Sequence, residues 1–217
     1  MNFTRVFLSA ALLVSLAMGT AQADSLIENG GFESPLFAPD LSEEGNFSPF
    51  FGFGAPAPIQ DSTNPFTGAS HLAATTGGAD NAFAGVQQTA TDFIVGESYT
   101  FELYALAEGP LATNAEFRIE WLDDLGGFVG GQFDTNVDIT AGLTTTEYNR
   151  FELTAIAPTG ATQLRAVIAL QSFGAGDGTG TVFFDDVSVT GPKAIPEPAS
   201  AALLAIGLVG LASRRRR

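Results

Sequence analysis

The side chains that most often carry chemistry are unevenly represented in this chain of 217 residues. It has no cysteine, which excludes thiol chemistry and cysteine-bound zinc. It has one histidine, His71, and therefore a single candidate base for a Ser-His-Asp triad. Its 24 acidic residues are so numerous that no pair stands out as the two carboxylates of a glycosidase. We therefore predict a protein that is not an enzyme, with an exported glycosidase as the weaker alternative.

Polar side chains alternate with apolar ones in several segments, which is the pattern of half-buried strands. The polar sides of these segments offer hydrogen-bond donors, acceptors and one aromatic ring on which a sugar can stack. We predict that they line one concave carbohydrate-binding surface, or else form a solvated face with ordinary cross-strand ion pairs. The residues of this predicted surface are Glu102, Tyr104, Arg118, Glu120 and Arg165. Alternation directs Trp121, the only tryptophan, into the core.

The elements that must position these side chains are short segments separated by Gly, Pro, Asn, Asp and Thr. About eight strands in one domain predict an all-β fold, a β-sandwich of jelly-roll type. The long, proline-rich and aromatic stretch 36–67 is expected to be a loop, either packed on the sandwich edge or forming a binding rim. The expected strands are 25–27, 71–74, 84–89, 98–107, 115–122, 149–155, 163–170 and 181–190.

The charge of the predicted domain, residues 24–192, is strongly negative. It holds 23 acidic but only three basic residues, which gives a net charge near −20. Such a domain repels the phosphates of nucleic acids and anionic lipids, so we expect no nucleic-acid partner. The same charge favours the binding of cations.

Both ends of the chain look like targeting segments. Residues 1–23 have a basic start, an apolar stretch and a small-x-small cleavage site at 21–23, as in a secretory signal peptide that is read by the Sec export machinery. The other end, 193–217, has three parts in order. An extended box comes first, an uncharged, mostly apolar run 199–213 follows, and a basic tail closes the chain. The box is Pro196, Glu197 and Pro198, and the tail is Arg214, Arg215, Arg216 and Arg217.

This tripartite end resembles the PEP-CTERM sorting signal of exported Gram-negative proteins. The resemblance implies that an exosortase recognises the box, and that the apolar run holds the protein transiently in the inner membrane as a transmembrane helix. It also implies that processing releases the protein to the cell surface or extracellular matrix.

A second resemblance lies at the two ends of the domain. Residues 26–33 (LIENGGFE) and 183–189 (FFDDVSV) are similar to the first and last strands of galactose-binding-like jelly rolls, among them carbohydrate-binding modules. In that family a structural calcium ion often ties these strands together, which here implies Glu33, Asp185 and Asp186 as ligands. Alternation along 183–189 places Asp185 on the core face. The alternative is that the aspartates are solvated or hydrogen-bonded to backbone amides.

Together these features predict an exported, exosortase-processed surface or matrix protein, and the second resemblance implies that it binds exopolysaccharide. The alternative is a purely structural surface protein without a glycan ligand.

Overall fold

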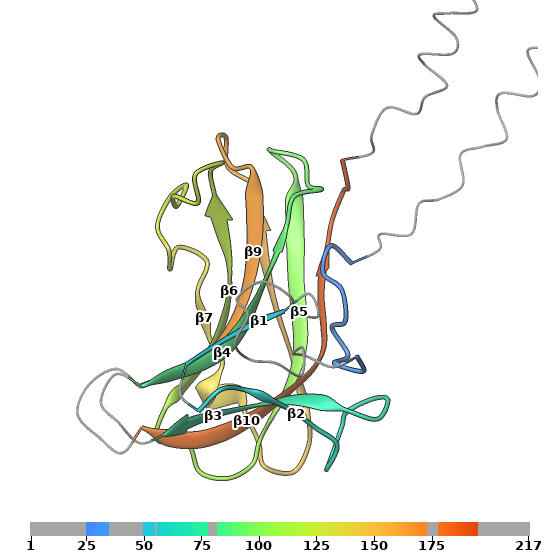
Figure 1. Ribbon diagram of the computed structural model, residues 1–217, viewed down its shortest axis with the longest axis vertical. Coiled ribbons are helices and arrows are strands. Elements are labelled where there is room, and N and C mark those ends of the chain that lie inside the picture. Colours follow the sequence, from blue (N-terminus) through green and yellow to red (C-terminus); the bar gives the residue numbers. More distant parts are fainter. Residues whose placement is uncertain (1–24, 35–49, 55, 78–81, 173–177, 195–217) are drawn as a thin grey trace, which may run out of the picture.

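The computed structural model describes residues 25–34, 50–54, 56–77, 82–172 and 178–194. This part of the chain folds into two antiparallel five-stranded sheets that pack face to face, as a jelly-roll β-sandwich (Figure 1). It contains no α-helix, and hence none long and apolar enough to cross a membrane. The predicted signal peptide, the sorting box with its apolar run and basic tail, and most of the predicted loop 36–67 lie outside the described residues.

The two sheets are called sheet A and sheet B, and each takes strands from along the whole domain. Sheet A has the order β1-β4-β9-β6-β7, and sheet B has the order β2-β3-β10-β5-β8. The strands of sheet A are β1 (Phe51–Gly54), β4 (Phe83–Ala90), β9 (Gln163–Gln171), β6 (Asn114–Leu122) and β7 (Val137–Asp138). Those of sheet B are β2 (Ile59–Asp61), β3 (His71–Gly77), β10 (Thr179–Thr190), β5 (Ser98–Ala107) and β8 (Asn149–Ile156).

The all-β prediction is confirmed, and seven of the eight expected strands are present. The expected strand 25–27 is wrong. Leu26 N–H does bond to the Val189 carbonyl, but the positive φ angles of Asn29 and Phe32 turn the chain away before a ladder forms. The short strands β1 and β2 lie inside the stretch that was expected to be a loop.

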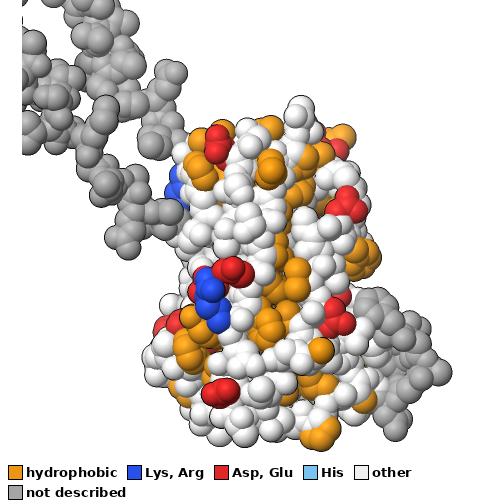
Figure 2. Space-filling model, turned by 180° about the vertical axis from the view of Figure 1, so that it is seen from behind, with side chains coloured by type: hydrophobic (Ala, Val, Ile, Leu, Met, Phe, Trp, Pro, Cys, Tyr) orange, Lys and Arg blue, Asp and Glu red, His pale blue; other side chains and the backbone are white. Residues whose placement is uncertain are grey.

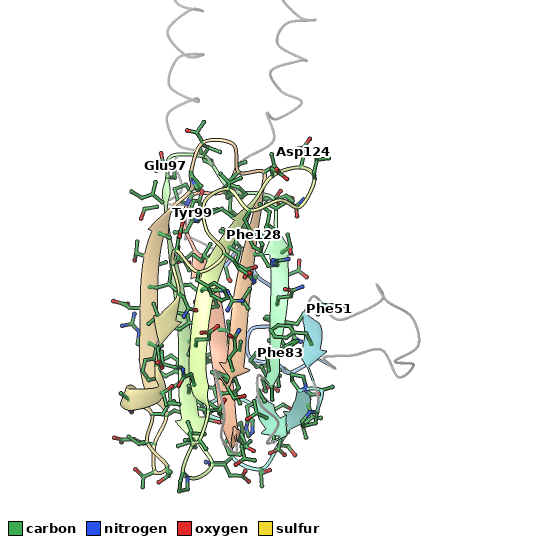
Figure 3. The ribbon with its side chains drawn as sticks, turned by 90° about the vertical axis from the view of Figure 1, so that its left-hand side faces the viewer. Phe51, Phe83, Glu97, Tyr99, Asp124 and Phe128 are labelled. Carbon is green, nitrogen blue, oxygen red and sulfur yellow. The ribbon has the colours of Figure 1, made fainter. Side chains whose placement is uncertain are left out.

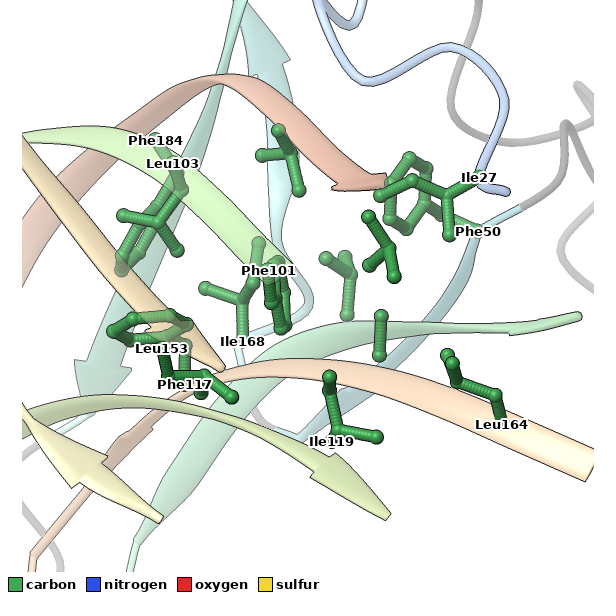
Figure 4. Close-up of a cluster of buried hydrophobic side chains, with 14 of the residues drawn as sticks. Ile27, Phe50, Phe101, Leu103, Phe117, Ile119, Leu153, Leu164, Ile168 and Phe184 are labelled. Carbon is green, nitrogen blue, oxygen red and sulfur yellow. The ribbon is translucent and has the colours of Figure 1, made fainter. Parts of the chain in front are cut away.

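The core lies between the two sheets and is built by strict alternation. In β5, Tyr99, Phe101 and Leu103 are fully buried and face β6, where Phe117 meets Phe101 edge-on at a centroid distance of 5.1 Å. Figure 4 shows these rings among aliphatic side chains from both sheets. Trp121 belongs to this cluster, so its predicted inward orientation is confirmed. Each large side chain buried here stabilises the sandwich by about 1.5–3 kcal/mol.

The last strand, β10, departs from alternation at a β-bulge. The register with β5 shifts between Asp185 and Ser188, and Asp186 adopts a positive φ of 45°. As a result Val182 and Phe184 face the core before the bulge, and Val187 and Val189 face it afterwards. The prediction that Asp185 lies on the core face is therefore wrong, because the bulge changes which residues point inward.

Candidate functional site

The outer face of sheet A is defined by the register of its strands. Small residues, Gly85, Val167 and Ala169, form its centre, and a side-chain carbon at Gly85 would come within 2.7 Å of the Phe53 ring. Larger side chains border this centre on both sides. Across the strands the outward rows are Phe53–Gly85–Ala169–Glu116, Phe51–Gln87–Val167–Arg118 and Thr89–Arg165–Glu120.

A network of ion pairs occupies the β6 side of this face. Arg118 Nη1 lies 2.5 Å from Glu116 Oε1, and its Nε lies 2.7 Å from Glu120 Oε1. Arg165 pairs with the second oxygen of the same Glu120. The side chains of Arg118, Glu116 and Glu120 are at most 5% exposed. Arg118 and Glu120 were expected on a sugar-binding or solvated face, and instead they are buried with Glu116 beneath a covering segment.

That covering segment is 123–138, which consists of the connection after β6 and the short strand β7. Thr135 exchanges two hydrogen bonds with the backbone of Ile119, and the Asn136 amide donates to Glu116 Oε2 at 2.9 Å. Burial raises the pKa of Glu116, while the bonds from Asn136 and Arg118 act in the opposite direction. The segment thus turns a polar sheet face into a rigid, internally paired layer.

Phenylalanine rings flank the centre of the sheet A face. At the β1–β4 edge, Phe51 and Phe83 are exposed on the same side of the sandwich (Figure 3), and the ring of Phe53 lies 6.0 Å from the Phe83 ring. On the other side, the Phe133 ring lies 4.9 Å from the Arg118 guanidinium carbon, and Phe128 lies 5.6 Å from that of Arg165. Both rings remain exposed.

The five residues predicted to line one carbohydrate-binding surface do not share a surface. Arg118, Glu120 and Arg165 are on sheet A, whereas Glu102 and Tyr104 are on the outer face of sheet B. Alternation predicts which side of a strand is polar, but it does not predict which sheet the strand joins. The prediction of a single shared surface is therefore wrong, and sugar binding by any of the five stays a prediction.

The outer face of sheet B presents its polar groups differently. Arg150 on β8 lies 2.6 Å from Glu102 and 2.7 Å from Glu152, and all three side chains reach solvent. The bond from Arg150 holds the pKa of Glu102 below its usual value. Tyr104 is stacked beneath Phe66 at a centroid distance of 4.2 Å, so Phe66 covers the ring that was expected to meet a sugar.

Segment 62–70 covers part of the outer face of sheet B, around Tyr104, and contacts both predicted aspartates. Asp185 is fully buried there, and its Oδ2 accepts hydrogen bonds from the backbone N–H groups of Phe66 and Thr67 at 2.9 and 3.1 Å. The Thr67 hydroxyl donates to Asp186. Burial raises the pKa of Asp185, and these amide donors lower it.

Glu33 reaches the same segment from the start of the domain. Its Oε1 accepts from the N–H groups of Ala69 and Ser70 at 2.8 and 3.0 Å. The structure thus brings Glu33, Asp185 and Asp186 to one segment, although the described residues contain no group of three side chains placed as metal ligands. Calcium binding by these three residues stays a prediction.

His71 is fully buried on the same outer face of sheet B. Its ring contacts Phe183 at 4.5 Å between centroids, and Nε2 lies 3.4 Å from the Asp61 carboxylate. Burial lowers the pKa of His71, and Asp61 offsets part of that shift. The Asp61 carboxylate is also bonded to Thr63, which further lowers its own pKa. His71 is thus enclosed by its neighbours and does not line an open surface.

Sequence reasoning missed the exposed phenylalanines of sheet A. Phe51 was noted only as part of an aromatic loop, and Phe83, Phe128 and Phe133 were not singled out. The available signal was an aromatic residue in a glycine-rich or strand-edge position, where little core is available to bury it. Figure 2 shows the side of the molecule away from Phe51 and Phe83, on which hydrophobic side chains form a band along the long axis with charged side chains on either side.

Solved structures similar to this chain are mostly carbohydrate-binding modules. The CBM22-1 xylan-binding domain from Paenibacillus barcinonensis Xyn10C aligns with 82% of this chain and 100% of that chain, at 17% identity and a TM-score of 0.53. TmCBM61, solved in complex with β-1,4-galactotriose, aligns with 77% of this chain and 98% of that chain, at 15% identity and a TM-score of 0.50. The body therefore has the β-sandwich fold of carbohydrate-binding modules.

Catalytic proteins are also found among the similar structures. The enzymatically active domain of tailspike protein 4 from Bacteriophage CBA120 aligns with 77% of this chain at 18% identity and a TM-score of 0.55. The match spans only 21% of that protein's chain. At these identities the similarity establishes the fold alone.

The C-terminal residues 194–217 match the PEP-CTERM protein-sorting motif, which confirms the resemblance seen in the sequence. The motif marks an exported protein that is anchored or processed at the cell envelope. No curated protein matches the chain in sequence.

Proposed function

We propose that this protein is exported, processed by an exosortase, and binds exopolysaccharide at the cell surface or in the extracellular matrix without cleaving it. The observation that carries the proposal is the outer face of sheet A. Exposed phenylalanines border both sides of this face, and the polar side chains of Gln87, Thr89 and Arg165 lie between them.

The chemistry of this face suits a sugar chain. The apolar faces of pyranose rings pack on aromatic side chains, while a few placed polar groups fix orientation by hydrogen bonds. Arg165 is held by Glu120 and by the Phe128 ring, so little side-chain freedom is lost when it donates to a hydroxyl group. The buried ion-pair network to which Arg165 is joined through Glu120 therefore contributes to binding by holding this side chain in place.

A glycan array probed with the mature protein tests the proposal. Phe83→Ala removes an exposed ring from sheet A, and Phe66→Ala removes a similarly exposed ring from segment 62–70, over sheet B, as the matched control. We expect Phe83→Ala to weaken binding about tenfold, equivalent to about 1.4 kcal/mol, and Phe66→Ala to leave it unchanged.

Other outcomes of the array favour other functions. If no glycan binds, the alternative of a purely structural surface protein is supported. If a glycan on the array is hydrolysed, the protein is a glycosidase, and the non-catalytic assignment fails.

Processing is tested separately by the intact mass of the mature protein. We expect cleavage close to the Pro-Glu-Pro box at 196–198, because extended proline-flanked segments are accessible to a peptidase. A mature form that still carries Arg217 contradicts processing.

We also propose one structural calcium ion at Glu33 and Asp185, with Asp186 beside it. The support is the convergence of these three carboxylates on segment 66–70 in a domain with a net charge near −20.

A further inference from the structure

Turns at one end of the sandwich carry exposed apolar side chains at their tips. Ile94 and Val95 lie in the β4–β5 turn, Leu125 lies in the turn after β6, and Ile156 ends β8. Leu125 and Ile156, at 90% and 66% exposure, are the two most exposed of the large hydrophobic residues in the described part of the chain. We call these four residues the apolar tips.

Backbone pairing holds the apolar tips at the same end. Ile156 pairs with Ser98, and Gly96 N–H bonds to the Ala157 carbonyl at 2.8 Å, which joins the β4–β5 and β8–β9 turns. Thr162 N–H bonds to the Leu122 carbonyl, which joins the β8–β9 turn to the turn after β6. Figure 3 shows Glu97 and Asp124, from two of these turns, at one end of the sandwich.

The chain enters the sorting motif from this same end. Lys193 forms a β-bridge with Phe93, and Ala194 N–H bonds to the Asp92 carbonyl at 3.0 Å. The buried Tyr99 hydroxyl ties this arrangement together, because it donates to the Pro192 carbonyl at 2.7 Å and accepts from Ile94 N–H. The exit point of the chain is thus fixed beside the apolar tips.

The length of the following segment limits how far the tips can be from a membrane. The uncharged run of the sorting motif begins at Ala199, five residues after Ala194. A fully extended chain spans at most about 3.6 Å per residue, so these five residues reach about 18 Å. Hence, while the run is held in a bilayer, the exit point of the chain at this end of the sandwich lies within about 18 Å of the bilayer.

We propose that the apolar tips form a membrane-contact surface, which inserts into the interface of the bilayer that holds the sorting run before the tail is processed. The inference rests on the proposed sorting of the protein. The partner is an electrically neutral lipid surface, because Asp92, Glu97, Asp123 and Asp124 outnumber Lys193 among the charged residues of these turns and would be repelled by anionic lipid.

The absence of cysteine from the sequence makes a direct test practical. Leu125→Cys places one environment-sensitive fluorophore on a tip, and Thr145→Cys places the same label in an exposed turn at the opposite end of β5 as the matched control. The full chain is reconstituted in phosphatidylcholine vesicles, and the vesicle-bound fraction is measured. We expect a blue-shifted emission and quenching by lipid-attached quenchers for the label at position 125, and for that label alone.

A second variant tests whether the apolar side chains cause the contact. With the label at position 125, Ile156→Ser should shift the balance between the bilayer-contacting and free orientations about tenfold toward the free one. Replacing part of the lipid with phosphatidylglycerol should also reduce quenching. Equal water exposure of the labels at 125 and 145 overturns the proposal, as does shielding of position 125 only in membranes that contain an exosortase. Neither result depends on glycan binding, which the array measures independently.

Discussion

Arg118 on sheet A and Arg150 on sheet B have the same kind of partner, but one arginine is buried and the other is exposed to solvent. Each arginine lies between two glutamates, with Glu116 and Glu120 around Arg118 and with Glu102 and Glu152 around Arg150. The Arg118 side chain is 5% exposed beneath segment 123–138, whereas the Arg150 side chain is 48% exposed. Both arginine–glutamate clusters arise because charged and apolar residues alternate along a strand.

The difference shows that burial, rather than the pairing itself, determines how much stability is lost when an ion pair is broken. Breaking a buried pair leaves a charge without water or partner, which is costly. An exposed pair exchanges its partner for water at almost no cost. The two outer faces can therefore be compared by removing one group at a time.

The largest effect is expected for Arg118→Met. This change leaves Glu116 and Glu120 buried, with Arg165 as the remaining cation of the network, and should lower the free energy of unfolding by about 3–5 kcal/mol. For a domain of this size the melting temperature should fall by about 10 °C, as measured by thermal denaturation. Arg150→Met is the matched control and should melt close to the wild type. Equal melting temperatures for the two variants would contradict the comparison.

The next effect concerns the hydrogen bonds that the buried carboxylate of Asp185 on sheet B accepts from backbone N–H groups. Asp185→Ala removes the acceptor for the backbone N–H groups of Phe66, Thr67 and Asp186, so the free energy of unfolding should fall by about 3 kcal/mol. Asp186→Ala loses a bond to the Thr67 hydroxyl and should cost less than half as much. Urea denaturation of both variants measures the difference. A larger loss in Asp186→Ala would reverse the assigned roles.

Calcium removal should produce a smaller, ligand-specific change. A chelator should lower the melting temperature by several degrees, because a bound ion stabilises the folded state by about 2.7 kcal/mol at a hundredfold excess over Kd. Calcium should restore the lost stability better than magnesium, and Asp185→Ala should lose this response. Sodium chloride at equal ionic strength is the control, and an equal gain from sodium leaves the carboxylates as hydrogen-bond acceptors only.

The smallest effect is a pH dependence that arises from His71. Burial lowers the pKa of His71, so the unfolded chain binds the proton at a higher pH than the folded one. The free energy of unfolding should therefore fall as the pH drops below about 6.5, by no more than about 1.4 kcal/mol per pH unit. His71→Gln should flatten this part of the curve. An unchanged slope in His71→Gln would assign the pH dependence to carboxyl groups instead.

The sequence predicted the fold better than the site, for a physical reason. Alternation in 98–107 identified the buried faces of Tyr99 and Phe101, because a period of two is a local property of a strand. Local patterns say nothing about which sheet β5 or β6 joins, and so Tyr104 and Arg118 were placed on one surface. They also gave no sign that segment 123–138 would cover the polar side of β6, since that contact depends on tertiary packing.

The bulge in β10 shows a second limit of prediction from the sequence. A single residue with a positive φ, Asp186, shifted the inward positions of the strand and moved Asp185 to the other face. An Asp in the left-handed region is tolerated more readily than most residues, but no pattern of polarity in 183–189 indicates where the shift occurs. Glu33 and Asp185 both contact segment 66–70, while their role as calcium ligands, which the resemblance implied, stays a prediction.

The central position of β10 also has a mechanical consequence. This strand pairs with β3 on one side and β5 on the other, and it leads directly to the residues that enter the sorting motif. Tension applied through the tail acts along β10, so its ladder bonds are loaded together in shear rather than opened one after another. A molecule held by its tail and by a polysaccharide on sheet A would transmit pulling force from β10 through the ladders of sheet B and across the core to sheet A.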